Sequence, residues 1–213
     1  MSLHVEIIAV TLFRQNCTLM WDDETNDAVF TDVGGNVPRL LEEAEKRGLK
    51  PRAVWLTHGH LDHVAGVVEL ARHIPNLEVI GPHEADRFLL ANLSEITANY
   101  NFPVSPPFVP SRWLEEGDSL RLGKYGFKVL HIPGHTPGHV VFYCEEVGLL
   151  LAGDVIFYES IGRTDFERSN HDDLVRNIRE KILTLPDDTQ IVTGHGRTTT
   201  VLHEKQHNPY LQA

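Results

Sequence analysis

The stretch Thr57-His58-Gly59-His60-Leu61-Asp62-His63 decides how the rest of this chain is interpreted. It places three imidazoles and a carboxylate within six residues. An apolar run at 53–56 precedes it and an apolar segment of helical period at 64–74 follows it, so the pattern predicts a strand, a ligand-bearing loop and a helix. Imidazole nitrogens and carboxylate oxygens are ligands that Zn²⁺ and related divalent metals accept. The stretch therefore predicts a metal site.

The spacing within this stretch suggests how the ligands divide. Side chains alternate along an extended backbone, so His58 and His60 point to the same side and are expected to hold one ion. Asp62 and His63 lie where the chain turns into the helix, which suits a second ion nearby. The alternative is that Asp62 caps the helix and that the histidines form a solvated loop. The density of the cluster favours metal binding.

Composition sets limits on the class of protein. The chain has 213 residues, of which 41% are hydrophobic and 23% charged, as expected of one globular domain that spans residues 1–213. A net charge of −11 disfavours nucleic-acid backbones and anionic membranes as partners. We see no secretory signal, no apolar run long enough to span a bilayer, and no disulfide or metal spacing around Cys17 and Cys144. We therefore expect a cytoplasmic protein with reduced thiols.

Periodicity and turn residues predict alternating strands and helices. Strands are expected at 5–10, 17–21, 28–33, 53–56, 78–80, 119–122, 127–132, 140–144, 149–152 and 190–193. Helices are expected between Pro38 and Gly48 and at 62–74, 83–93, 172–185 and 198–207. Residues 99–110, rich in proline and aromatics, are expected to form a surface connection between two halves. This order of elements favours an α/β architecture of two packed sheets covered by helices.

Three further ligand candidates follow predicted strands. His135 lies in Gly134-His135-Thr136-Pro137-Gly138-His139 and is placed to be a third nitrogen ligand beside His58 and His60, whereas His139 is expected to support the site or to pack. Asp154 ends the strand at 149–152, and a carboxylate can bridge two metals. His195 follows the last strand. Alone, each would be an ordinary turn residue, but ligand types recur at four strand ends, where sites of α/β proteins gather.

The whole set resembles the metallo-β-lactamase superfamily of dinuclear metallohydrolases, over nearly the full chain. The resemblance implies an αββα four-layer sandwich of two mixed sheets flanked by helices, with the site at one edge. It also implies a division of ligands, with a water and Asp154 bridging the two metals. The first metal would be held by His58, His60 and His135, and the second by Asp62, His63 and His195.

Within that superfamily the motifs are similar to those of the glyoxalase II group, and most similar to its short bacterial branch. Besides the two histidine motifs, this resemblance rests on Ser160-Ile161-Gly162-Arg163-Thr164-Asp165-Phe166. It implies hydrolysis of S-D-lactoylglutathione or a related acyl-glutathione to acid plus thiol by a hydroxide that bridges two divalent ions, Zn²⁺ first and Fe or Mn as alternatives. Asp62 and Asp154 would be catalytic, Asp62 by orienting that hydroxide.

The substrate residues are less well defined by the sequence. By resemblance to a basic residue of glyoxalase II, Arg163 would hold a substrate carboxylate, which suits a guanidinium. The alternative is a surface arginine paired with Asp165 or Glu159. Tyr158 and Phe166 would line the pocket, or else pack. Full-length glyoxalase II adds a C-terminal helical domain that helps bind glutathione, and only one helix is expected after residue 195, so the thiol part of the substrate stays open.

Other activities of the same scaffold are alternatives. Persulfide dioxygenases use one iron on residues that match His58, His135 and Asp154. Lactone or phosphodiester hydrolysis is a third reading, although the acidic balance counts against a nuclease. Zinc β-lactamases usually carry a cysteine at the Asp154 position, which counts against that activity. The complete ligand set disfavours a non-catalytic binding module. The sequence predicts no oligomeric state, and a monomer is compatible with it.

Overall fold

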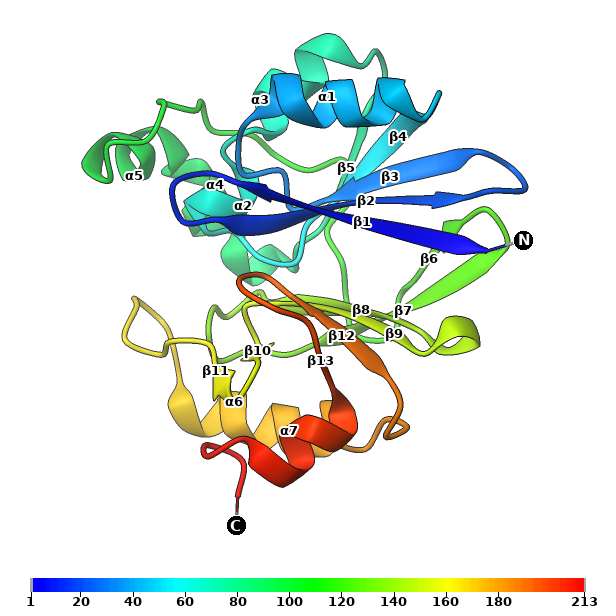
Figure 1. Cartoon of the computed structure of the whole chain (residues 1–213). Helices are drawn as coiled ribbons and strands as arrows, with labels where there is room; N and C mark the ends of the chain where they lie inside the picture. The colour runs from blue at the N-terminus through cyan, green and yellow to red at the C-terminus, as the bar shows by residue number, and fades with distance from the viewer. Residues whose placement is uncertain (1, 213) are drawn as a thin grey trace.

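The computed structural model describes residues 2–212 and consists of four layers, helices, sheet, sheet and helices (Figure 1). The first sheet has the strand order β1-β2-β3-β4-β5 and the second the order β13-β12-β9-β8-β7-β6. A separate hairpin, β10-β11, lies beside the second sheet. The expected α/β sandwich of two mixed sheets is confirmed.

The strands lie close to the predicted ranges. The first sheet contains β1 (Leu3–Val10), β2 (Gln15–Asp22), β3 (Asp27–Thr31), β4 (Lys50–Trp55) and β5 (Glu78–Ile80). The second contains β6 (Ser119–Leu122), β7 (Tyr125–His131), β8 (Val140–Cys144), β9 (Leu149–Gly153), β12 (Gln190–Thr193) and β13 (Thr199–Thr200). The small hairpin, which the sequence did not predict, pairs β10 (Ile156–Phe157) with β11 (Ser160–Ile161).

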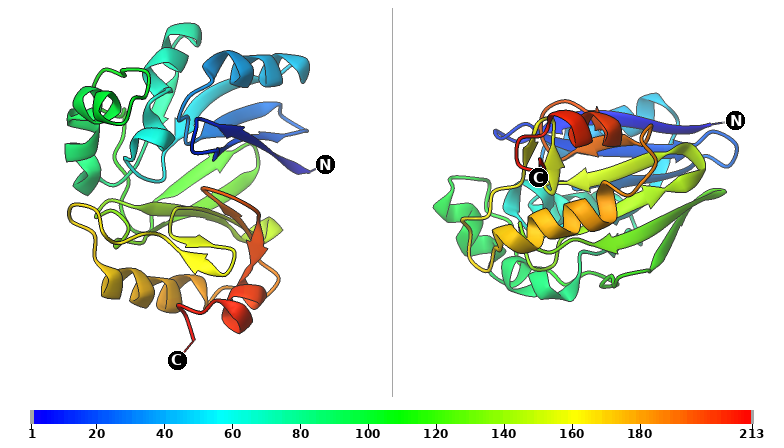
Figure 2. Two further views of the ribbon diagram at one scale, coloured as in Figure 1. Left: turned by 60° about the vertical axis from the view of Figure 1, so that its left-hand side comes forward. Right: turned by 90° about the horizontal axis from the view of Figure 1, so that it is seen from below.

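Helices cover the outer face of each sheet (Figure 2). The first sheet carries α1 (Val37–Lys46) and α3 (Val67–His73), and the second carries α6 (His171–Asn177), its wider continuation η3 (Ile178–Ile182) and α7 (Val201–His207). The remaining short helices are α2 (Leu61–Val64), η1 (Glu84–Asp86), α4 (Arg87–Ala91), α5 (Leu93–Asn99) and η2 (Glu145–Val147). Within residues 2–212, none of these helices combines the length and the apolar character that crossing a bilayer requires.

Alternation along the strands produces three buried clusters between the four layers. Val54 of β4 faces the helices, whereas its neighbour Trp55 faces the other sheet. The Trp55 ring lies 5.0 Å from the ring of Phe127 and 5.6 Å from that of Phe142, both on the second sheet. Val141, next to Phe142, belongs to the third cluster, under α6 and α7. The sheets are therefore buried on both faces, which fixes their register.

Strand direction brings the ends of four strands to one edge. In the first sheet β3, β4 and β5 are parallel. In the second, β9 and β12 are parallel, and β7 runs in the same direction because both β7 and β9 are antiparallel to β8. The loops after β4, β7, β9 and β12 therefore meet where the two sheets adjoin, and these are the loops that carry the predicted ligands.

Two predicted helices are divided in the structure. The segment expected as one helix at 62–74 forms α2 and α3, with Gly66 between them. The Gly66 amide donates to the Val33 carbonyl at 2.9 Å, and a Cβ at Gly66 would lie 2.9 Å from the Gly35 nitrogen. This close approach of two backbones interrupts the helix. The helix expected at 83–93 is likewise divided into η1 and α4, followed by α5.

The other differences concern helix ends. The expected helix at 172–185 widens into η3 after Asn177, and the segment at 198–207 begins with the short strand β13 before α7. Residues 99–110 contain no helix or strand after the end of α5, as expected. The aromatic residues of this segment differ in burial: Phe102 is buried in the core, and Tyr100 is half exposed.

Candidate metal centre

The first group of ligand candidates consists of three imidazoles from two loops. His58 and His60 follow β4, and His135 lies in the loop after β7. Nδ1 of His60 lies 3.1 Å from Nε2 of His58 and 2.9 Å from Nε2 of His135. We call these three residues the trihistidine triad. Three nitrogens so close together, all facing one point, form a half-site for one metal ion.

The second group, which we call the carboxylate triad, consists of Asp62, His63 and His195. Oδ2 of Asp62 lies 3.1 Å from Nε2 of His195 and 3.8 Å from Nε2 of His63. The alternative role of Asp62 as a helix cap does not hold, because His60 is the residue at the cap of α2. Asp62 lies in the first turn, and its carboxylate faces His195 instead.

Asp154, directly after β9, lies between the two triads. Its Oδ2 lies 3.7 Å from Nε2 of His135 in the trihistidine triad and 3.5 Å from Nε2 of His195 in the carboxylate triad. Its Oδ1 lies 3.3 Å from Nε2 of His63. The structure thus brings all seven predicted ligand side chains together, with one carboxylate placed to reach both half-sites.

In four of the five ligand imidazoles, those of His58, His63, His135 and His195, the far side of the ring contacts a fixed partner. Nδ1 of His63 lies 3.0 Å from Oδ2 of Asp32, and Nδ1 of His135 lies 2.7 Å from the Arg163 carbonyl. Nδ1 of His58 lies 3.0 Å from the Thr57 hydroxyl, and Nδ1 of His195 lies 3.0 Å from the carbonyl of residue 13. An imidazole that donates from Nδ1 keeps its Nε2 lone pair free toward the centre, as a metal ligand requires.

Burial keeps the trihistidine triad neutral. It lowers the pKa of His58 well below its usual value, together with the charges of nearby histidines. Burial and the charge of His135 lower the pKa of His60 to about 3. The pKa of His135 is also lowered by burial, despite the opposing charge of Asp154. Neutral imidazoles are the form that binds metals, so this half-site is ready to coordinate at neutral pH.

The carboxylate triad has the opposite electrostatics. Burial alone would lower the pKa of His195, but its hydrogen bonds to Asp154 and Asp62 raise it to about 9. Burial opposes charge on His63 as well, yet the surrounding carboxylates raise its pKa well above the usual value. Burial opposes charge on Asp154 too, but the charge of His63 and the hydrogen bonds from His195 and His63 together lower its pKa well below the usual value. The field at this half-site therefore favours a positive charge.

The buried polar atoms fit a metal cation. Nε2 of His63 and Oδ1 of Asp154 are buried and have no hydrogen-bond partner, although they lie 3.3 Å apart. Buried polar groups are rarely left unpaired, because each unpaired group costs about 1–3 kcal/mol. A cation between the triads would satisfy both atoms. The donor set of imidazole and carboxylate, without thiolate, suits Zn²⁺, Fe or Mn.

An open cavity of about 870 Å³ lies over the centre. Asp62, His60, His135, Asp154 and His195 line its floor, and its walls are largely apolar. The wall residues are Phe13, Leu61, Phe88, Leu89, Ile96, Tyr100, Phe157 and Phe166, with polar or charged groups from Asn92, Glu95, Asn99, Ser160, Arg163 and Glu167. The cavity is large enough for a small organic substrate whose reacting bond lies at the floor.

The loop after β11 provides one wall of this cavity. The Phe166 ring lies 4.7 Å from the His60 ring, and the Arg163 guanidinium lies 4.7 Å from the Phe166 centroid. Arg163 is largely exposed and forms two hydrogen bonds to Asp165, from Nε at 3.0 Å and from one terminal nitrogen at 2.8 Å. Arg163 thus lines the cavity and is paired with Asp165, as one of the two interpretations expected, whereas its binding of a substrate carboxylate stays a prediction.

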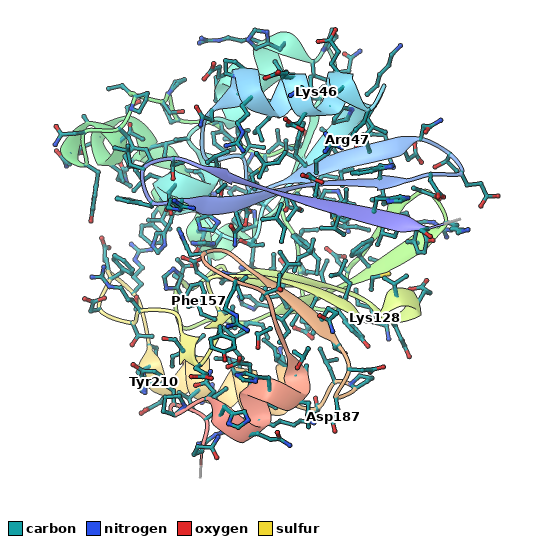
Figure 3. The ribbon with its side chains drawn as sticks, viewed as in Figure 1. Lys46, Arg47, Lys128, Phe157, Asp187 and Tyr210 are labelled. Carbon is teal, nitrogen blue, oxygen red and sulfur yellow. The ribbon has the colours of Figure 1, made fainter. Side chains whose placement is uncertain are left out.

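Tyr158 was expected to line the pocket, and the structure places it elsewhere. Its ring stacks on the His203 ring at 4.5 Å, and the Arg197 guanidinium lies 3.8 Å above it. Phe157 lines the cavity in its place and is labelled near the junction of the two halves in Figure 3. Neighbouring residues of the short strand β10 and its turn point in different directions, so only one of these two aromatics reaches the cavity.

Two buried acids that support the site were not singled out from the sequence. Asp32 follows β3 and accepts hydrogen bonds from the Thr57 amide at 2.8 Å and the Thr57 hydroxyl at 2.7 Å, in addition to its contact with His63. Asp86, at the end of η1, contacts two ligand loops. Asp32 could have been found as a further acid at a strand end, whereas no pattern around Asp86 marks it. His139 packs behind the centre, its ring stacked on His58 at 4.5 Å.

Comparison with known proteins places this arrangement in a family. The profile of the metallo-beta-lactamase superfamily matches residues 10–195. Hydroxyacylglutathione hydrolase GloC of Haemophilus influenzae is 44% identical over 212 residues, which are 99% of this chain and 99% of that protein. The crystal structure of BLEG-1 B3 metallo-beta-lactamase matches with a TM-score of 0.90 and 32% identity over 99% of this chain and 100% of that one. TTHA1623 in a di-iron-bound form matches with a TM-score of 0.87 and 34% identity over 97% and 100%.

These matches cover the strand ends that carry the seven side chains, and the fold of the solved structures agrees with the four layers described above. The profile and a relative of this similarity along the whole chain lead to one conclusion. The chain belongs to the metallo-beta-lactamase superfamily.

Proposed function

We propose that this chain is a metal-dependent thioester hydrolase that cleaves S-D-lactoylglutathione or a related acyl-glutathione to acid plus thiol. The observation that carries the proposal is the meeting of the two triads around Asp154 at the floor of an open cavity. The similarity to hydroxyacylglutathione hydrolase GloC, at 44% identity over the whole chain, supports this choice of substrate.

The residues present would hold two divalent cations. His58, His60 and His135 would bind the first, Asp62, His63 and His195 the second, and Asp154 both. When bound, such a pair polarises a carbonyl oxygen and makes water nucleophilic near neutral pH. We propose zinc, with iron or manganese as alternatives, because the ligand set has no thiolate that would select a soft metal.

The chain itself contributes orientation and exclusion of water. The Asp62 carboxylate faces the floor of the cavity and is placed to accept a hydrogen bond from the attacking water, which would orient that water toward the thioester carbonyl. Phe166 shields the rings of His60 and His135 from solvent. The departing thiol has a pKa near 8.5, as for cysteine, so it leaves as thiolate without a strong general acid.

The cavity walls would hold the rest of the substrate. The apolar side, which includes Phe88, Leu89 and Phe157, would contact the acyl and thiol chains, and Arg163 would bind a substrate carboxylate in exchange for Asp165. We propose a small-molecule substrate rather than nucleic acid or a membrane, in keeping with the net charge of −11. The two buried free cysteines fit a reducing compartment such as the cytoplasm, and a monomer suffices to build the site.

The test is a thioester assay combined with elemental analysis of the purified protein. We expect about two equivalents of metal and release of free thiol from S-D-lactoylglutathione, measured with a thiol reagent. Asp154→Asn is the inactive control. A protein that holds two metals and turns over no member of a panel of acyl-glutathione thioesters would contradict the proposal.

Two alternatives are separated in the same experiment. His58, His135 and Asp154 lie together, as a mononuclear iron dioxygenase of persulfides would require. One equivalent of iron with oxygen uptake would support that activity. Because BLEG-1 B3 metallo-beta-lactamase is structurally similar, a chromogenic β-lactam belongs in the substrate panel, as does a lactone. We expect turnover of thioesters to exceed turnover of both.

A further inference from the structure

Asp86 connects the two loops that carry the trihistidine triad. Its side chain is fully buried. Oδ2 accepts a hydrogen bond from the Gly59 amide at 2.8 Å, and Gly59 lies between His58 and His60. The same oxygen accepts from the Thr136 hydroxyl at 2.8 Å, and Thr136 follows His135. One carboxylate oxygen therefore joins the chain segments of all three imidazoles.

The second oxygen of Asp86 strengthens the same connection. Oδ1 accepts from the Gly138 amide at 2.6 Å, and the His83 amide in the cap of η1 donates to the Gly138 carbonyl at 3.1 Å. The approach is so close that a Cβ at Gly138 would lie 2.6 Å from the Asp86 carboxylate. Next to Gly138, His139 stacks on the His58 ring. The contact between η1 and this loop thus has no room for another side chain.

Asp86 makes no corresponding contact with the carboxylate triad. Among the described residues, no hydrogen bond or ion pair joins Asp86 to Asp62, His63 or His195. Those residues are supported by other groups: Asp32 contacts His63, and the carbonyl of Phe13 contacts His195. Asp32 also reaches His58 through the Thr57 hydroxyl, so Asp32 supports both half-sites, whereas the hydrogen bonds of Asp86 go only to the loops of the trihistidine triad.

We propose that Asp86 is a positioning residue that sets the metal affinity of the trihistidine half-site and leaves that of the carboxylate half-site largely unchanged. The inference rests on the proposed metal-dependent function. Groups that hold metal ligands in place typically change metal affinity by about 10–100-fold when they are replaced. Here the effect passes through the loop residues Gly59, Thr136 and Gly138, because among the described residues Asp86 makes no hydrogen bond or ion pair to a ligand ring.

The test compares metal binding of the wild-type protein with that of Asp86→Asn. The asparagine keeps the size of the side chain but turns an NH₂ group toward donors that need an acceptor. Thr136→Val is a milder variant that removes one of the three hydrogen bonds and keeps the shape of the side chain. Glu204→Gln is the matched control, because Glu204 is also a fully buried, hydrogen-bonded carboxylate, but it serves the β10-β11 turn and α7.

Cobalt titration followed by visible absorption identifies which half-site is affected. His135→Ala and His195→Ala supply reference spectra of proteins that lack one ligand of the trihistidine triad or of the carboxylate triad. We expect Asp86→Asn to bind the first equivalent of cobalt with wild-type affinity, and the spectrum of this one-cobalt protein should be like that of His135→Ala. The second equivalent should bind about 10–100-fold more weakly than in the wild type. Thr136→Val should be weakened less, and Glu204→Gln should bind as the wild type does.

Three results would overturn the inference. In the first, Asp86→Asn and Thr136→Val both bind two equivalents of cobalt with wild-type affinity. In the second, Asp86→Asn binds both equivalents more weakly by the same factor. In the third, the spectrum of Asp86→Asn with one equivalent of cobalt is like that of His195→Ala. A wild-type protein that binds no metal would overturn the proposed function, and this inference with it. A wild-type protein that binds two metals but cleaves no thioester would overturn only the proposed substrate, since the readout here is binding.

Discussion

The trihistidine triad and the carboxylate triad lie side by side but are built on different physical principles. The trihistidine triad consists of two buried imidazoles, His58 and His135, and the partly buried His60, and burial lowers the pKa of all three. In the carboxylate triad, the acids raise the pKa of His195 to about 9, and the His195 side chain is 27% exposed. The protonation state of the trihistidine triad is thus set mainly by burial, and that of the carboxylate triad mainly by charge. Changes in packing and changes in charge should therefore affect the two differently.

The largest effect is expected from Asp154→Asn, because Asp154 serves both triads. The amide NH₂ would face His63 or His195, and the negative charge between the half-sites would be lost. We expect thioester hydrolysis to fall by about 10³-fold, since metal and charge stabilisation of a transition state is worth several kcal/mol. Steady-state kinetics measures this loss. Asp172→Asn, an exposed acid at the start of α6, should keep wild-type rates.

His58→Ala and His195→Ala separate packing from charge. Both should reduce hydrolysis by about 10²-fold or more, because each removes a metal ligand. Their effects on folding should differ. In protein treated with a chelator, His58→Ala leaves a hole at a fully buried position and should lower the free energy of unfolding by about 2–3 kcal/mol. His195→Ala removes the charge that compensates the buried Asp62 and Asp154, so its loss of stability should be present at pH 7 and disappear as the pH rises through about 9, whereas the loss in His58→Ala should stay constant over that range.

Denaturant unfolding followed by circular dichroism provides this comparison. Losses with the same pH dependence in the two chelated variants would mean that packing and charge do not distinguish the triads. A loss that disappears above about pH 9 in His58→Ala only would reverse the assignment.

Gly194→Ala tests the position of Asp154 without removing a ligand. A Cβ at Gly194 would lie 2.0 Å from Oδ1 of Asp154 and 2.9 Å from the His63 ring. The carboxylate must therefore move away from the carboxylate triad. We expect hydrolysis to fall by about 10-fold, with both metals retained, since a small misplacement at a reacting centre is costly. Elemental analysis and kinetics measure both quantities, and Gly126→Ala, which faces only a flexible glutamate, is the control.

Asp165→Asn asks whether the loop that supports His135 also selects the substrate. Without the acid, the Arg163 guanidinium would be free to bind a substrate carboxylate. Because an exposed ion pair is worth about 0.2–1 kcal/mol, we expect KM for a glutathione thioester to fall by up to about 5-fold. KM for an uncharged thioester should not change. An unchanged KM for both substrates would leave Arg163 without a role in binding.

The smallest expected effect is on the rate at which Cys17 and Cys144 are alkylated at different pH values. Burial raises the pKa of Cys144 to about 12, and burial with the charge of Asp32 raises that of Cys17. A raised pKa leaves little thiolate below that pH, so alkylation of the folded protein should stay slow from pH 7 to 9. The unfolded protein should react faster as pH rises through about 8.5. Mass spectrometry counts the modified thiols.

The same measurement after chelation sharpens the contrast between the triads. If packing alone holds the trihistidine half-site, both thiols should stay protected when the metals are removed. Rapid alkylation of Cys17 in chelated protein would show instead that the metals hold this region together.

Much of the fold could be predicted because strand signals are local. The ranges expected for β6, β8 and β12 agree with the structure, since alternating or continuous apolar runs bounded by turn residues specify them. Helix ends were predicted less well. The break at Gly66 depends on the backbone of Val33 and Gly35, which are distant in sequence, and no local pattern reports such an approach.

The same distinction applies to the site. Tyr158 and Phe157 are equally aromatic in the sequence, and only the path of the β10-β11 hairpin decides that Phe157 enters the cavity. Asp86 lies among ordinary helix residues, and its partners come from segments near residues 59 and 138. Side chains that act through distant backbone groups carry no periodic or motif signal, because their role depends on contacts that exist only after folding.

The amino-acid sequence by itself determined which atoms are available for chemistry, namely five imidazoles and two carboxylates that follow strands, because metal-ligand chemistry depends on residue type. It also determined the layered α/β class, because apolar periodicity is set residue by residue. The tertiary structure alone decided how close the two half-sites lie, where Asp154 lies and which acids support the rings. Those features depend on distances between strand ends, and such distances are set by how the two sheets pack.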